Sequence, residues 1–308
     1  MKLKGLYHKR KADRKRQIKE EFTLKEATSY GGYNLLADYI SKKKVETVLR
    51  KCVGIEKAEW SRYDLSFVLR YIIDGYILGM ERTKHFEMIE NDALIREKLM
   101  VDKLPDYTTL NKDLKRFKRE EDIMGLKEAG IRLIRNKLRD KRDNIVYDFD
   151  STVESVYGNQ EGAGYGYNPG KPGRPSYNTL MCFEATEDLH IGSILRGGDV
   201  HTCKGAGGFM EEIDRQMGHI VKRYDKLKKR QKVLARFDSG FDSEETYKKA
   251  EELGWGYVGK VRCFRPLKLS IFGIKRWRKV GGSARDIEVS SMRYKVGSWS
   301  RQRRVVII

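Results

Sequence analysis

The sequence predicts a mixed α/β domain over residues 143–262, an all-helical region before it over residues 31–140, and a β-rich segment after it over residues 263–308. Three observations support this organisation. Apolar residues recur at helical spacing in the first half of the chain. After residue 143, strand-like and helix-like runs alternate, which is typical of a mixed sheet with helices packed on it. The formal net charge of +20 over 308 residues points to a polyanion, most often a nucleic acid, as the partner.

Composition excludes several other classes of protein. The four cysteines stand singly, so neither a disulfide scaffold nor a multi-cysteine zinc site is expected, and a reducing cytoplasm fits. The charged N-terminus has no apolar run behind it, so no signal peptide is expected. The most apolar stretch, residues 65–80, is too short to span a membrane and contains Arg70 and Asp74.

Residues 1–30 are expected to form a basic N-terminal arm. Residues 1–16 hold eight lysines and arginines against one acid, Asp13. Such a block stays extended until an anion neutralises it. It is either an arm that grips DNA or a solvated tail that aids solubility. As an arm, its candidate DNA contacts are Lys9, Arg10, Lys11, Arg14, Lys15 and Arg16.

The helical region contains a candidate helix-turn-helix near residues 104–117. Pro105 breaks the chain, Asp106 or Thr108 supplies an N-cap, and a polar helix follows. In a helix-turn-helix, the second helix would present basic and amide side chains to the major groove of DNA. An ordinary surface helix of a bundle explains the pattern as well. The candidate DNA contacts here are Asn111, Lys112, Lys115 and Arg116.

In the α/β region, glycine and proline punctuation separates the expected elements. The expected strands are 144–150, 179–186, 190–195, 233–237 and 255–261, followed by short β-like runs at 286–296 and 303–308. The expected helices are 205–229 and 243–253, the second capped by Ser243. A loop rich in glycine and proline, residues 158–175, interrupts the first strands.

Two expected strands end in aspartates, the residue type that phosphoryl-transfer sites use to hold metal ions. Asp148 and Asp150 alternate onto one face of the first strand, and Asp238 ends a later strand. Converging carboxylates are costly without a cation, and hard oxygen ligands suit Mg²⁺ or Mn²⁺. Two such ions activate an attacking oxygen and stabilise a leaving oxygen in phosphodiester chemistry. The alternative is that these aspartates only cap turns.

Other motifs give weaker signals. The glycines at positions 162, 164 and 166 are followed by prolines and by no helix, so they are not a dinucleotide fingerprint. No Walker motif is present. His201 and Cys203 are close in sequence, but two ligands alone do not make a zinc site.

A series of motifs resembles one known family. They are Asp148-Phe149-Asp150-Ser151-Thr152-Val153, Tyr157-Gly158-x-Gln160-Glu161-Gly162-Ala163, Gly166-Tyr167-Asn168-Pro169, Pro172-Gly173-Arg174-Pro175-Ser176-Tyr177, Leu195-Arg196-x-Gly198-Asp199-x-His201 and Arg236-Phe237-Asp238-Ser239-Gly240-Phe241. Their order and spacing resemble the DDE transposases of bacterial insertion sequences, specifically the insertion-sequence 1380 family. The resemblance extends over nearly the whole chain.

The resemblance implies an RNase H-like catalytic domain and two-metal phosphoryl transfer on DNA. The catalytic aspartates of the family fall on Asp150 and Asp238, with Asp148 as a further metal ligand and Arg174 as a further DNA contact. It also implies two Mg²⁺ or Mn²⁺ ions per complete site. The implied partners are double-stranded DNA, as terminal inverted repeats and as target, and a second copy of the chain that pairs the two ends.

The sequence departs from the family in two places. Asp199 stands where asparagine is usual. The third acid, a glutamate on a helix beyond a β-rich insertion, has no counterpart, since Glu288 lies in a strand-like run. We therefore expect a C-terminally truncated transposase with weak or absent catalysis that still binds DNA. A DNA-binding protein without chemistry and another RNase H-like nuclease are the alternatives.

Overall fold

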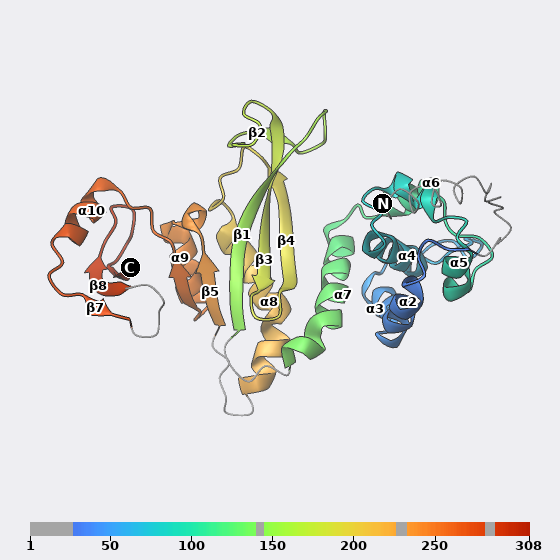
Figure 1. Cartoon of the computed structure of the whole chain (residues 1–308), viewed down its shortest axis with the longest axis horizontal. Helices are drawn as coiled ribbons and strands as arrows, with labels where there is room; N and C mark the ends of the chain where they lie inside the picture. Colours follow the sequence, from blue (N-terminus) through green and yellow to red (C-terminus); the bar gives the residue numbers. More distant parts are fainter. Residues whose placement is uncertain (1–26, 140–144, 226–232, 281–286) are drawn as a thin grey trace, which may run out of the picture. The chain divides into compact units, whose positions relative to one another are not determined.

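The computed structural model describes residues 27–139, 145–225, 233–280 and 287–308, and the chain divides into two compact units, residues 1–126 and 127–308 (Figure 1). The basic residues expected to form the arm, Lys9 to Arg16, lie outside the described residues. No helix within the described ranges has both the length and the apolar character that a membrane span needs.

The described part of the first unit is helical and contains no strand. Its helices are α2 (Tyr33–Lys42), α3 (Val45–Cys52), α4 (Leu65–Ile77), the 3-10 helix η1 (Thr83–Met88), α5 (Ala93–Leu99) and α6 (Tyr107–Leu114). The apolar face of α4 supplies Val68 and Tyr71 to the core, where the ring of Tyr71 meets Phe86 edge to face. The Asp106 side chain caps α6 by accepting a hydrogen bond from the Thr109 amide at 2.8 Å.

Helix α7 (Glu120–Arg139) runs across the division between the units. Ile131 and Leu138 lie two turns apart on the same face of this helix, and both are buried in the core of the second unit. The division between the two compact units therefore falls inside α7, between residues 126 and 127.

A mixed sheet forms the centre of the second unit. Its strands are β1 (Ile145–Ser155), β2 (Gly164–Tyr165), β3 (Pro175–Glu184), β4 (Leu189–Gly197), β5 (Val233–Phe237) and β6 (Gly256–Gly259). Strands β4, β3 and β1 are antiparallel neighbours, and β1, β5 and β6 are parallel neighbours, so the order is β4-β3-β1-β5-β6, with β2 also paired to β3. This confirms the expected mixed sheet.

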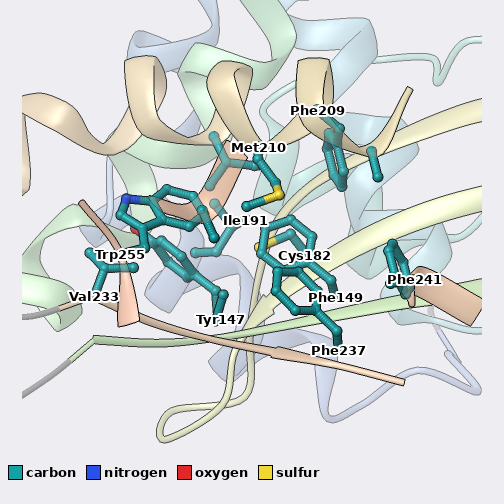
Figure 2. Packing of buried hydrophobic residues seen from close by; sticks show 14 of the residues in the cluster. Tyr147, Phe149, Cys182, Ile191, Phe209, Met210, Val233, Phe237, Phe241 and Trp255 are labelled. Atoms are coloured by element: carbon teal, nitrogen blue, oxygen red, sulfur yellow. The ribbon is translucent and has the colours of Figure 1, made fainter. Parts of the chain in front are cut away.

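Aromatic packing fixes the face of the sheet that becomes the core. Tyr147 and Phe149 of β1 are buried, and the ring of Phe149 lies 5.3 Å from Phe237 of β5 and 5.8 Å from Phe209 of α8 (Ala206–Asp225) (Figure 2). Figure 2 shows Phe209 and Met210 reaching down from α8 onto this face. Because side chains alternate along a strand, the intervening Asp148 and Asp150 point to the opposite face.

The described part of residues 263–308, expected to belong to a β-rich insertion, contains one helix before its three strands. Helix α10 (Arg265–Phe272) begins with Pro266 in its first turn and buries Leu267. Proline is well tolerated there, because the backbone amides of the first turn have no acceptor within the helix and the amide that proline lacks is not needed. A three-stranded antiparallel sheet follows, made of β7 (Arg278–Lys279), β8 (Glu288–Tyr294) and β9 (Arg303–Ile307).

The segment is attached through α9 (Glu244–Glu252), the helix that Ser243 caps as expected. Arg303 of β9 is 6% exposed and forms ion pairs with Glu244 at 2.6 Å and Glu251 at 3.1 Å. Its guanidinium also lies 5.3 Å from the ring of Trp299. One arginine thus links the end of the described chain to the α/β core.

Candidate active site

The two aspartates that follow adjacent parallel strands meet at one edge of the sheet. The last register pair between β1 and β5 is Phe149 with Phe237, so Asp150 and Asp238 come next on neighbouring strands. Ends of neighbouring strands in an open α/β sheet are where such folds present functional groups. The sequence placed both residues at strand ends, which is correct for Asp238 but not for Asp150, because β1 continues to Ser155 in its pairing with β3. The pairing of β1 with β5 makes the two residues neighbours.

Both carboxylates are exposed and have no ion pair in the described ranges. Asp150 accepts a hydrogen bond from the Ser151 amide at 2.7 Å, and Asp238 accepts one from the Gly240 amide at 2.9 Å. Asp238 thereby caps the short 3-10 helix η2 (Ser239–Phe241), so the capping interpretation holds for this residue. Each carboxylate still has lone pairs open for a cation. Within the described chain, however, no group of three or more His, Cys, Asp or Glu side chains is arranged to hold a metal ion.

Asp148 has a different environment from the other two aspartates. It is the register partner of Arg236 on β5, and the Arg236 guanidinium binds both of its carboxylate oxygens. This contact raises the pKa of Arg236. Asp148 therefore shares a sheet face with Asp150, as expected, but its charge is matched by an arginine of the next strand.

A cavity of about 820 Å³ opens beside the aspartate pair. Asp238 lines it, as do Ser151 and Thr152, the two residues after Asp150. Its other walls are mostly neutral hydroxyl and amide groups, with a second acid, Asp199, and basic side chains from Lys171 and Arg262. The lining thus sets two carboxylates against two basic side chains and suits a polar ligand.

Arg196 shapes the wall of this cavity formed by residues 198–204. Its guanidinium donates to the carbonyl oxygens of His201 at 3.4 Å, Thr202 at 3.4 Å and Lys204. It also donates to the side-chain oxygen of the buried Asn178 at 2.8 Å. In the sequence, Arg196 was recognised only as part of a motif. Its role depends on the chain turning back along β4, which no local pattern reveals.

Close backbone packing explains the glycines of the loop before β3. A Cβ at Gly166 would overlap the carbonyl of Gly198, and one at Gly164 would overlap the side chain of Asp199. Buried Asn168 holds the rest of the loop by donating to Ser155 Oγ at 2.8 Å. These glycines therefore serve packing beside the cavity, in line with the absence of a dinucleotide fingerprint.

Basic side chains of the same loop gather around one tyrosine. The Lys171 ammonium lies 4.5 Å and the Arg174 guanidinium 4.7 Å from the centre of the Tyr157 ring. Arg174 is exposed, so it is free to meet an anion. His201 and Cys203 contact each other at 3.1 Å, but no third ligand joins them in the described chain.

The candidate contacts on α6 divide into two groups. Lys112 and Lys115 are exposed and Asn111 is half-buried. Arg116 differs, because its guanidinium is ion-paired with buried Asp113 at 2.9 Å. The helix that the sequence suggested is present, while its arginine is already engaged within the protein.

The mixed sheet with paired aspartates on adjacent strands fits the class of DDE-type transposase domains. The comparison of sequences agrees: the chain belongs to the family described as transposase DDE domain group 1, which matches residues 10–308. No match was found among curated proteins.

Solved structures with some similarity are also transposases. The catalytic domain of Mos1 mariner transposase is 12% identical over 46% of this chain and 61% of its own, with a TM-score of 0.27. The piggyBac transposase synaptic complex with hairpin DNA is 13% identical over 85% of this chain and 58% of its own, with a TM-score of 0.39. The match thus spans about three fifths of each of these chains. Similarities of this size do not by themselves define the fold or the function.

Proposed function

We propose that this chain is the DNA transposase of an insertion sequence of the 1380 family, with an RNase H-like catalytic domain. It binds the terminal inverted repeats of its element as a homodimer and cleaves and joins double-stranded DNA. The observation that carries the proposal is the placement of Asp150 and Asp238 directly after the last register pair of β1 and β5, with no cationic partner among the described residues. The family membership supports it.

The donor set fits Mg²⁺ or Mn²⁺. Two exposed carboxylates side by side repel each other and offer hard oxygen ligands, so a divalent cation relieves the repulsion. When bound, such ions would activate the attacking oxygen and stabilise the leaving oxygen of a phosphodiester. Asp150 and Asp238 would hold them, and Lys171 and Arg262 in the adjoining cavity would orient the DNA phosphates.

Asp148 has two possible roles, because Arg236 binds its carboxylate. As a metal ligand it would have to give up the ion pair, whereas as a positioning residue it keeps Arg236 aligned beside the aspartate pair. We therefore expect Asp148→Asn to impair cleavage less than Asp150→Asn does.

The arrangement of the acids favours a second candidate function. Since no three His, Cys, Asp or Glu side chains of the described chain are grouped to hold a metal ion, two ions would be held weakly, and residues 1–308 would bind DNA with little chemistry. The alternative of a simple RNase H-like nuclease would yield hydrolysis products without joined strands.

The test is Mg²⁺- or Mn²⁺-dependent nicking and joining of a duplex carrying the element's ends. We expect cleavage by residues 1–308 to be weak, and Asp150→Asn or Asp238→Asn to lower it further, by about 10²-fold or more, because electrostatic stabilisation of the reacting phosphate is lost. Asp188→Asn is the matched control, since Asp188 is exposed with φ 53°, a conformation that asparagine tolerates. Cleavage unaffected by both active-site substitutions would refute the assigned site.

A further inference from the structure

The first unit contains a second charged centre, which we call the α6 groove. It is a cavity of about 330 Å³ between residues 57–63, residues 103–106 and α6. Its lining combines an excess of cations with two acids. The cationic residues are Lys57, Arg62, Lys103, Lys112 and Arg116, and the acids are Asp106 and Asp113.

Both acids of the α6 groove are already engaged within the protein. Asp106 caps α6 and accepts from the Thr108 hydroxyl at 2.7 Å, which lowers the pKa of its carboxyl. Asp113 has a side chain only 4% exposed and binds Lys57 Nζ at 2.6 Å and Arg116 Nε at 2.9 Å. Asp113 is therefore balanced by two cations, Asp106 serves as a helix cap, and the lining still holds five cations against two acids.

Three cations of the groove are exposed and have no ion pair within the described residues: Arg62, Lys103 and Lys112. Tyr63 contacts two of these residues, Arg62 and Lys103. The Arg62 guanidinium lies 5.6 Å from the centre of the Tyr63 ring, and the Tyr63 hydroxyl donates to the Lys103 carbonyl at 2.7 Å. The segments before α4 and before α6 are thus joined, and both point cations at one cavity.

We propose that the α6 groove binds phosphates of the duplex DNA backbone and so fixes where α6 lies on the DNA. Clustered arginine and lysine donors in excess over the acids of the same cavity are what a phosphodiester requires. The volume is at the lower end for ligand sites, which suits a backbone phosphate. Arg62 and Lys103 become DNA contacts, and Asp113 becomes a positioning residue for Lys57 and Arg116. This inference rests on the proposed DNA-binding function.

The test compares two double variants of the full chain by fluorescence anisotropy on a terminal-repeat duplex and on a scrambled duplex, over a series of salt concentrations. The groove variant is Arg62→Ala with Lys103→Ala, and both residues are exposed. The matched control is Lys42→Ala with Lys51→Ala, which removes the same charge from exposed positions of α2 and α3 in the same unit. Melting temperatures confirm that both variants fold.

We expect the groove variant to bind both duplexes at least about 10-fold more weakly near 0.1 M salt, and its plot of log K against log salt to be shallower by about 2. The control should shift affinity and slope much less. If the groove variant and the control bound DNA with equal affinity and salt dependence, the phosphate site in the α6 groove would be refuted, while DNA binding by the chain would stand. Weaker binding to the terminal repeat alone would mean base recognition and would also overturn a phosphate site. A wild-type chain that binds neither duplex would overturn the proposed function together with the groove.

Discussion

Asp113 on α6 and Asp238 after β5 both line a cavity, yet their surroundings are opposite. Asp113 is buried and contacts two cations, while Asp238 is exposed and accepts only a backbone hydrogen bond. The Asp113 carboxylate balances the charges of Lys57 and Arg116, and the cavity still holds more cations than acids. The Asp238 carboxylate leaves negative charge unmatched at the edge of the sheet. The partners of a carboxylate, more than its presence beside a cavity, therefore indicate whether the site binds an anion or a cation.

The strongest test of this comparison applies the same substitution to both aspartates. Asp113→Asn leaves Lys57, 10% exposed, and Arg116 without their counter-charge, so we expect it to lower the free energy of unfolding by about 3 kcal/mol. Asp238→Asn removes repulsion with Asp150, so it should leave the free energy unchanged or raise it slightly. Urea unfolding of both variants measures the difference. Equal losses would show that Asp238 also has a structural counter-charge.

Glu244 is a third carboxylate, ion-paired with Arg303, and its contribution to stability depends on pH. The ion pair with Arg303 lowers the pKa of Glu244 from 4.5 to about 2. Because the pKa of the folded state is the lower one, the stabilisation is fully present above pH 4.5 and is lost as pH falls towards 2. We expect Glu244→Gln to cost about 1.5–3 kcal/mol at neutral pH and less in acid. Thermal unfolding between pH 7 and pH 2.5 checks this, and a loss independent of pH would contradict it.

The smallest effect on stability is expected at Asp148. Its partner Arg236 has a side chain 53% exposed, and Asp148 is itself 34% exposed, so solvent screens the pair. Asp148→Asn should change the free energy of unfolding by less than about 1 kcal/mol. A loss comparable with that of Asp113→Asn would place Asp148 among the structural carboxylates.

Much of the local structure followed from sequence pattern. Ser243 and Asp106 begin helices because their side chains accept backbone amides that the first turn leaves free. The alternation in β1 placed Tyr147 and Phe149 on one face and the aspartates on the other. Helix α10 was not expected from the sequence, and Leu267 alone among its residues is buried.

The division inside α7 was also beyond reach from the sequence. The helical pattern runs on to Arg139 without a break, while the burial of Ile131 and Leu138 depends on the sheet that forms after them. Arg116 was expected to face outward, and it is exposed, with an ion pair to Asp113 three residues before it. Only the packing of residues 57–63 beside α6 shows that Lys57 binds the same carboxylate.

Sequence pattern was sufficient to establish that this chain is strongly basic, that helices precede a mixed α/β region, and that aspartates lie in or directly after two of its strands. These properties are local, because charge, periodicity and capping depend on residues a few positions apart. Only the tertiary structure shows that β1 and β5 are neighbours in register. It also shows that Arg236 pairs with Asp148, while Asp150 and Asp238 have no ion pair among the described residues. Finally, it brings Arg62, Lys103 and Lys112 into one groove. Those properties depend on contacts between residues far apart in the chain, and only the packed fold fixes them.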